Sequence, residues 1–163
     1  MRHVRLKISD LAAVTGYTRF QMRGLLKEVF PNPPGKKGGT ASQRTFSPHD
    51  LLVLVVACEI ERKYGVKRAV LALVGEALRK TLTGPRAANR NARLVVTFTP
   101  PVASYLVPEA SVSEGLVLML GGLFAKVDEY LGVSGPANDI NQTDLPLTPA
   151  LVRGHRGGDS HSR

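Results

Sequence analysis

Apolar and polar positions alternate through the first thirty residues in a pattern that predicts two helices joined by a tight turn. Apolar residues at positions 8, 11 and 12 predict a short amphipathic helix, with Ser9 as its candidate N-terminal cap and Thr15-Gly16 as its end. Thr18 and Gln21 then form the Thr-x-x-Gln pattern, in which two side chains satisfy free backbone N–H groups at a helix start. A second helix is therefore expected directly after Thr18.

The second helix is predicted to have one apolar face and one basic face. Its apolar stripe consists of Met22, Leu25, Leu26 and Val29. The opposite face carries Phe20, Arg23, Gly24 and Lys27, with Arg19 at the flank. A short helix, a tight turn and a capped helix with a basic outer face are typical of a helix-turn-helix. A plain helical hairpin with solvated arginines would give the same pattern, so the two interpretations stay open at this point.

A basic, glycine-rich loop from Asn32 to Phe46 precedes a longer helical pair. Ser47 is a candidate cap, Pro48 suits the first helical position, and Asp50 places a negative charge at the positive end of the helix dipole. These signals favour a helix through the apolar run 51–58, which by itself would also suit a buried strand. The next helix is expected over 66–82, with a core stripe of Val70, Val74, Ala77, Leu78 and Leu82.

The second half of the chain predicts a linker, short strands and one more helix. Residues 83–92 have a linker composition. The alternation of Leu94, Val96 and Phe98 predicts a strand that Pro100-Pro101 stops. Two further strands are expected over 103–107 and 116–120, followed by a helix with the apolar stripe Leu123, Phe124, Val127 and Leu131. Residues 132–163 have the composition of a disordered tail.

The net charge of +9 lies entirely in the first half of the chain. Residues 1–50 hold nine Lys/Arg and three Asp/Glu, a net of +6, and residues 51–82 hold six and three, a net of +3. Residues 83–131 and 132–163 are each balanced, with four of each sign and three of each sign. The first half is therefore expected to bind a polyanion, and the second half is not.

The candidate chemistry gives no support for an enzyme, a metal site or a cofactor. The segment GKKGGT at 35–40 lacks the Gly-x-x-x-x-Gly-Lys-Ser/Thr order of a phosphate-binding loop. The four histidines are scattered, and the single cysteine, Cys58, lies in an apolar run where a buried structural thiol is expected. No apolar run reaches the ~20 residues of a membrane span, and the N-terminus does not resemble a secretory signal, so a cytoplasmic, nucleoid-associated protein is expected.

The residues from Arg5 to Leu82 resemble the MerR-type winged helix-turn-helix DNA-binding family. The resemblance is carried by five points in the family's order: Thr15-Gly16, Met22-Arg23, Arg44-x-Phe46, Ser47-x-x-Asp50 and Gly65. In that family a recognition helix is followed by a basic wing and two more helices. This chain departs from the family pattern at Gly24 and Leu25, where aromatic residues are usual, and it continues into a linker and strands instead of a long dimerising helix.

The resemblance implies which residues would contact DNA. Arg23 would contact the backbone, and the wing from Lys36 to Arg44 would touch phosphate or the minor groove. The full set of candidate DNA-binding residues is Tyr17, Thr18, Arg19, Phe20, Arg23, Lys27, Lys36, Lys37 and Arg44.

The sequence therefore predicts a mainly α N-terminal winged helix-turn-helix over residues 1–82, a small α+β module over 93–131 and a disordered tail. The expected function is a sequence-specific transcriptional regulator that binds double-stranded DNA as a homodimer, with 93–131 joining two copies or binding a protein partner. Two alternatives stay open: an architectural accessory factor, such as an excisionase-like or partition protein, and a protein-interaction module that only shares the fold.

Overall fold

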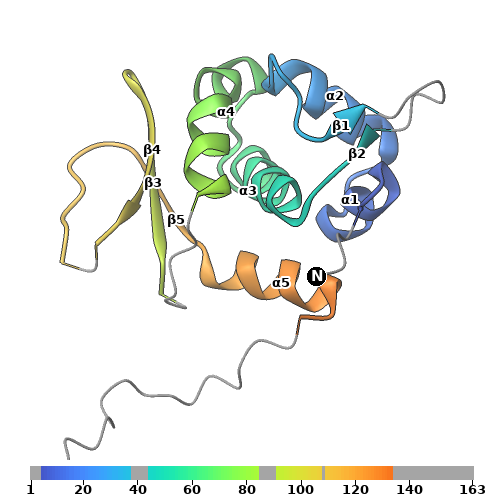
Figure 1. The fold of residues 1–163 in the computed structure, drawn as a ribbon. Helices are drawn as coiled ribbons and strands as arrows, with labels where there is room; N and C mark the ends of the chain where they lie inside the picture. Colours follow the sequence, from blue (N-terminus) through green and yellow to red (C-terminus); the bar gives the residue numbers. More distant parts are fainter. Residues whose placement is uncertain (1–4, 38–43, 85–90, 108, 134–163) are drawn as a thin grey trace, which may run out of the picture.

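The computed structural model describes residues 5–37, 44–84, 91–107 and 109–133 (Figure 1). Within these residues the chain is mostly helical, with a two-stranded hairpin and a small three-stranded antiparallel sheet. The elements in chain order are α1 (Ile8–Thr15), α2 (Arg19–Val29), β1 (Lys36–Lys37), β2 (Arg44–Thr45), α3 (Pro48–Tyr64), α4 (Arg68–Thr83), β3 (Arg93–Phe98), β4 (Pro101–Leu106), β5 (Leu116–Met119) and α5 (Gly121–Leu131).

Local capping fixes where the first three helices begin. At α2 the Gln21 N–H donates to Thr18 Oγ1 at 3.1 Å, and the Thr18 N–H donates to Gln21 Oε1 at 2.8 Å, so the predicted capping box is confirmed. Ser47 caps α3 in the same way, as expected. The expected cap at Ser9 is wrong. Helix α1 begins two residues earlier than that cap would allow because the N–H of Lys7 donates to Asp10 Oδ2 at 2.6 Å.

Helix α3 is the centre of the fold. Every residue from Leu51 to Cys58 is buried, and α1, α4 and α5 all pack against this helix. Figure 1 shows α3 surrounded by the other helices. The apolar run that would also suit a strand is therefore a helix, started by its cap and covered on all sides by other elements.

Helix α4 lies between α2 and the sheet. Its buried stripe is Leu71, Val74, Gly75, Leu78 and Leu82. The expected stripe differs from this one at Val70, whose side chain is 39% exposed, and at Ala77, which is only partly buried. Gly75 explains which face of α4 is buried against α2. A Cβ atom at this position would lie 2.5 Å from the carbonyl oxygen of Val29, so the glycine is what allows α4 to lie directly against the end of α2.

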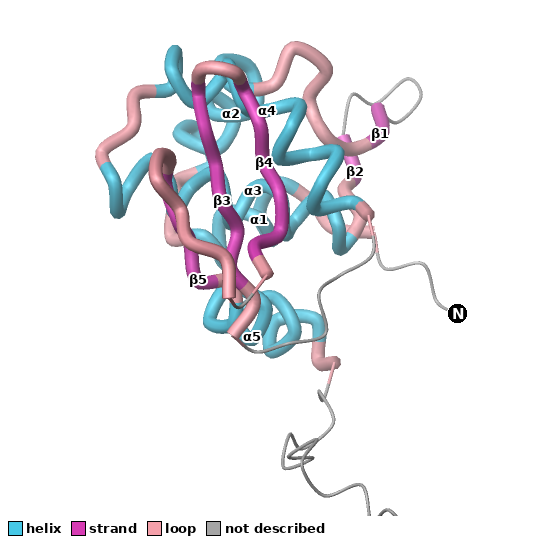
Figure 2. The backbone as a smooth tube through the Cα atoms, turned by 90° about the vertical axis from the view of Figure 1, so that its left-hand side faces the viewer, coloured by secondary structure: helices cyan, strands magenta, loops and turns pink. Residues whose placement is uncertain are grey.

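The three-stranded sheet has the order β4-β3-β5, with both neighbours antiparallel to β3 (Figure 2). Leu94 and Val96 are fully buried on the inner face, where β4 packs against α4. Strand β3 ends at Phe98, before Pro100-Pro101 as expected. Strand β4 begins at Pro101 instead of the expected Ala103, because β4 is an edge strand, where a proline without an N–H is tolerated.

The two halves of the chain share one hydrophobic cluster that runs from Leu6 to Val127. Helix α5 packs across α3, and its Tyr130 hydroxyl donates to Asp10 Oδ1 of α1 at 2.8 Å. The Thr81 hydroxyl of α4 donates to the Ala103 carbonyl of β4 at 2.6 Å. The expected boundary at 83–92 therefore crosses a continuous core. Residues 85–90 of this expected linker, and residues 134–163 of the expected tail, lie outside the described residues.

Candidate nucleic-acid interface

An open groove runs between the start of α1, the outer face of α2 and strand β2. Its volume is about 680 Å³. The lining residues are Lys7, Ile8, Ser9, Arg19, Arg23, Leu26, Lys27, Phe30, Pro31, Pro33, Arg44 and Phe46. We call this feature the basic groove, because five of these residues carry a positive charge and none of the described lining residues is acidic.

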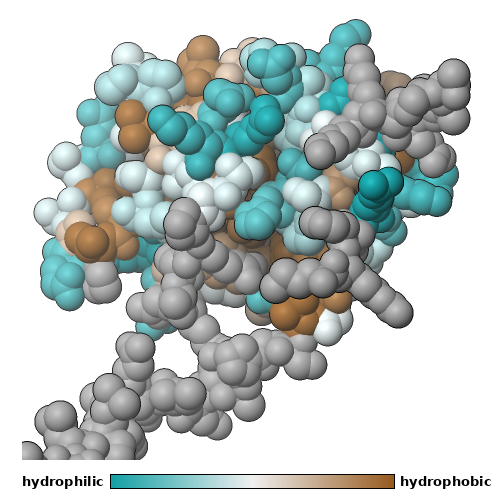
Figure 3. All heavy atoms as spheres, viewed as in Figure 1, coloured by the Kyte–Doolittle hydropathy of each residue, from teal (hydrophilic) through white to brown (hydrophobic). Residues whose placement is uncertain are grey.

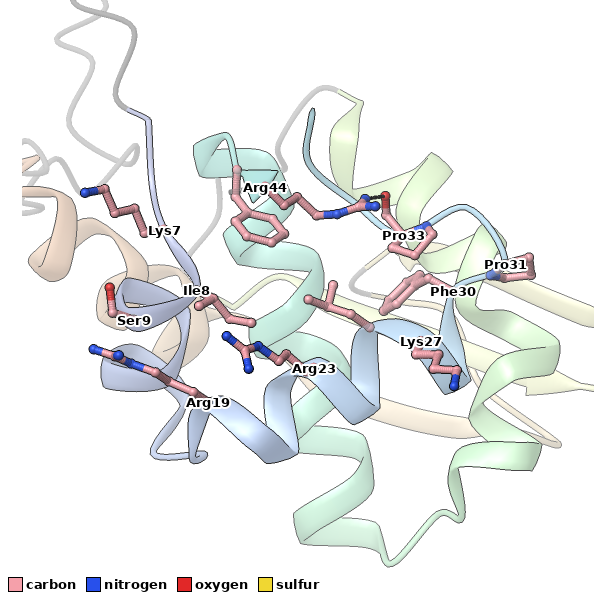
Figure 4. Close-up of a pocket in the computed structure, with 12 residues that line it drawn as sticks. Lys7, Ile8, Ser9, Arg19, Arg23, Lys27, Phe30, Pro31, Pro33 and Arg44 are labelled. Atoms are coloured by element: carbon pink, nitrogen blue, oxygen red, sulfur yellow. Dashed lines mark hydrogen bonds between the residues drawn. The ribbon is translucent and has the colours of Figure 1, made fainter. Parts of the chain in front are cut away.

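Helix α2 supplies three of the five cations of the basic groove. Arg19, Arg23 and Lys27 are four residues apart, so they lie on one stripe of the helix, and all three are exposed. Figure 4 shows them along α2, with Arg44 near Pro33 across the groove. The buried stripe of α2 is as predicted, Met22, Leu25, Leu26 and Val29. The basic face is therefore held outward by the burial of the opposite side of the same helix.

Arg44 closes the groove from the β2 side, and its guanidinium is tied to the backbone. Its Nη1 donates to the carbonyl oxygen of Pro33 at 2.6 Å and to that of Pro34 at 3.1 Å. The family resemblance implies that Arg44 faces DNA. In the structure its guanidinium joins β2 to the proline segment that follows α2, and its charge lies at the edge of the groove.

Lys36 and Lys37 form strand β1, which pairs antiparallel with Arg44 and Thr45 of β2. The expected basic loop is thus a hairpin at its base. Phe46 is buried, and it exchanges two backbone hydrogen bonds of 2.9 Å with Leu6. These contacts attach the hairpin to the chain just before α1.

The remaining predicted DNA contacts, Tyr17, Thr18 and Phe20, do not line the groove. The Tyr17 hydroxyl donates to Glu61 Oε2 at 2.8 Å, and burial together with this hydrogen bond raises the pKa of the phenol well above its usual value. Thr18 is occupied as the α2 cap. Phe20 is 84% exposed on α2, beside the basic stripe. Only Phe20 of these three therefore presents an uncommitted side chain to a partner.

Acidic residues near α2 are neutralised on its other side. In Arg68 of α4, Nε lies 2.7 Å from Glu61 Oε1 and Nη1 lies 3.1 Å from Glu28 Oε1.

The sequence did not predict a role for Arg68 or Lys7. Lys7 immediately precedes α1, and its place in the strongly basic first fifty residues was the available signal. For Arg68 the signal was Gly24, a glycine in the interior of a helix.

Within the part of the chain that the structure describes, neither the cysteine nor the histidine and acidic side chains form a metal or nucleophilic site. Cys58 is buried, and burial raises the pKa of its thiol to about 12, which makes it a poor nucleophile and a poor metal ligand. Among the described residues, no three His, Cys, Asp or Glu side chains gather closely enough to hold a metal ion.

Two further findings bear on the chain as a whole. Within the described segments, no helix combines the length and the apolar character needed to cross a membrane. Neither the models of known protein families nor the sequences of curated proteins give a match to this chain.

Proposed function

We propose that this protein is a sequence-specific DNA-binding transcriptional regulator that uses α1 and α2 as a helix-turn-helix and the β1–β2 hairpin as a basic wing. The observation that carries the proposal is the basic groove, with five cations on α2, on β2 and just before α1, and no acidic residue among those described in its lining. A duplex presents rows of phosphates beside a major groove that admits one helix, so a basic helix flanked by further cations matches its shape and charge.

The arrangement of α2 supports reading of bases as well as binding of phosphates. Arg23 and Lys27 are exposed on the helix, and the guanidinium of an arginine can donate two hydrogen bonds to the edge of a guanine. Phe20 stands next to them and offers an apolar surface to a thymine methyl group. Lys7, just before α1, and Arg44, on β2, line the groove away from α2 and suit contacts with the backbone.

The test begins with selection of bound duplexes from a random pool, followed by titration of the winning site at several salt concentrations. If all five groove cations meet phosphates, including any that also bond a base edge, log K should fall against log[salt] with a slope of about −4.5 per half-site. Affinity would then drop roughly 500-fold between 50 and 200 mM salt. Arg23→Ala should reduce the slope by about 0.9 and leave a drop of roughly 150-fold.

A matched control for this titration is Lys126→Ala on α5, an exposed lysine outside the basic groove. It should leave the slope at the wild-type value. If no duplex is enriched in the selection and retention is insensitive to salt, the DNA-binding proposal is wrong and a protein-interaction module becomes the better interpretation. Mapping the winning site to promoters would support a regulator, whereas attachment or centromere-like sites would support an architectural factor.

The homodimer is part of the same proposal and rests on the outer face of the sheet. Four apolar residues alternate along the strands with the buried residues of the sheet, so their side chains lie on its outer face: Val95, Val102, Val117 and Met119. Figure 2 looks onto this face of the sheet, which no helix covers and in front of which the loop preceding β5 passes. In Figure 3 some hydrophobic atoms reach the surface on the left of the molecule, around the sheet and this loop.

The edges of the sheet are less available than its face. At the β4 edge Pro101 has no N–H, and the Ala103 carbonyl accepts from Thr81. At the β5 edge the Val117 carbonyl accepts from the Tyr64 hydroxyl at 3.1 Å. A second copy would therefore meet this sheet face to face, in the half of the chain that carries no net charge to repel it.

The size of this face sets the strength expected of the dimer. Three strands of up to six residues cover roughly 300 Å² per copy, well below the ~800 Å² per partner of a stable interface. We therefore expect a weak dimer in free solution that forms on DNA carrying two half-sites about one helical turn apart. Light scattering with and without that DNA tests this. A monomer under both conditions would exclude the dimer, and Met119→Glu should abolish it without changing binding to one half-site.

A further inference from the structure

The flank of α2 opposite the basic groove faces the first turn of α4. Gln21, Gly24 and Glu28 share this flank, because their spacing of three and four residues places them on one stripe. Arg68, the first residue of α4, lies against all three positions. The contact joins residues about 40 positions apart in the sequence, so it fixes α2 against a distant helix.

The guanidinium of Arg68 uses each of its three nitrogens on a different partner. Nε donates to Glu61 Oε1 of α3 at 2.7 Å, Nη1 donates to Glu28 Oε1 at 3.1 Å, and Nη2 donates to the Gln21 carbonyl at 3.4 Å. The second oxygen of Glu61 accepts from the Tyr17 hydroxyl. One planar group therefore ties α2 to α3 and α4, and through Glu61 to the turn between α1 and α2.

Gly24 makes room for this group. A Cβ atom at position 24 would lie 2.6 Å from Arg68 Nη1 and 3.2 Å from Glu28 Oε1. The guanidinium thus lies on the surface of α2 where a side chain would otherwise stand. Glycine weakens a helix interior, so a glycine in the middle of an exposed helix calls for such a reason. The side chain of Arg68 is 21% exposed, which leaves it largely enclosed by its partners.

We infer that Arg68, seated over Gly24, sets the rotation of α2 about its own axis and thereby determines which bases the protein selects. This inference rests on the proposed function, since it takes α2 to be the helix that reads DNA. Arg68 is a positioning residue: it acts through α2 and contacts no base. A rotation of 10° moves a side-chain tip about 6 Å from the helix axis by roughly 1 Å. That displacement is enough to break a paired hydrogen bond to a base edge.

The experiment is Arg68→Lys, which keeps the positive charge and removes the three-way fork. Binding is measured to the selected duplex and to a random duplex, together with thermal unfolding. Affinity for the selected site should fall at least tenfold, while affinity for random DNA should stay within about twofold and the salt slope should not change. The matched control is Arg79→Lys on the same helix. The carboxylate partner of Arg79, Glu76, lies one turn away on α4 itself, and Arg79 Nη1 also donates to the Asn32 carbonyl beyond the C-terminal end of α2. None of these partners lies on α2 itself, so specificity should be unchanged.

Gly24→Ala is the second variant. It pushes the guanidinium away with a single methyl group, yet it favours the helix, so the thermal midpoint should not fall although specificity does. In the Arg68→Lys background it should cause no further loss of specificity. Equal loss of specific and random binding would overturn the inference, as would wild-type specificity in both variants. If the wild-type protein itself binds no duplex, the proposed function fails first, and the inference falls with it.

Discussion

Gly75→Ala is the substitution whose effect can be worked out most directly from the structure. The new Cβ atom would lie 2.5 Å from the Val29 carbonyl oxygen, whereas a carbon–oxygen contact needs about 3.3 Å. The obstacle is backbone, so no rotamer change relieves it. Helices α2 and α4 would have to move apart by roughly 0.8 Å, which loosens the packing of Val29 and Phe30, both buried at this crossing.

Two opposing contributions decide the size of the effect. Overpacking costs about 1–3 kcal/mol, and an overlap with backbone that no rotamer relieves belongs in the upper part of this range, about 2–3 kcal/mol. Replacing a glycine in a helix interior by alanine returns up to about 1 kcal/mol. A net loss of about 1–2 kcal/mol is expected, which lowers the melting temperature of a chain of this size by about 2–8 °C. Under the proposed function, affinity for the selected duplex should fall as well, because α2 is displaced.

The assay is thermal and urea unfolding followed by circular dichroism, with Gly122→Ala as the matched control. Gly122 lies in α5, and a Cβ atom there would meet nothing within 4 Å, so this control should be neutral or slightly stabilising. A Gly75→Ala protein that is as stable as the wild type would show that α2 and α4 do not cross as closely as described.

Three further substitutions or conditions test other parts of the structure. Thr18→Ala removes the hydroxyl that accepts from the Gln21 N–H and should cost about 1 kcal/mol in urea unfolding; an unchanged midpoint would contradict the cap. Arg44→Met breaks the bonds to the Pro33 and Pro34 carbonyls and should speed amide exchange at β2, with α3 unaffected. Burial raises the pKa of Cys58 from 9.0 to about 12, so its neutral thiol stabilises the fold below pH 9 and this stability is lost between pH 9 and 12. Cys58→Ala should flatten that decline in unfolding midpoint, and an equally steep decline would rule Cys58 out as its source.

Features that depend on neighbouring residues could be predicted from the sequence. The caps at Thr18 and Ser47, and the buried stripe of α2, follow from spacings of three or four residues that no distant contact overrides. The predicted cap at Ser9 was wrong because the Asp10 carboxylate, an equally local acceptor, accepts the Lys7 N–H, so α1 starts earlier. The predicted place of Val70 in the buried stripe was wrong because the face that α4 buries is set by the contact of Gly75 with Val29, two residues far apart in the chain.

Four of the five cations of the basic groove could be predicted from the sequence, but their arrangement could not. Arg19, Arg23 and Lys27 could be placed on one helical face from their spacing alone. The sequence could not show that Arg44 would be held by carbonyl groups, that Tyr17 would turn inward to Glu61, or that Lys7 would join the groove. Each of these depends on how the chain crosses over itself, which local patterns do not contain.

The enclosure of α3 has a practical consequence for dissecting the protein. A fragment that ended near residue 83 would retain every cation of the basic groove, yet it would lose α5 and the sheet. The sides of α3 and α4 that they cover, including Leu52 and Leu82, would then face water. Such a fragment should aggregate or partly unfold. Any attempt to transplant the half that carries the basic groove onto another protein should therefore carry the chain through Val133.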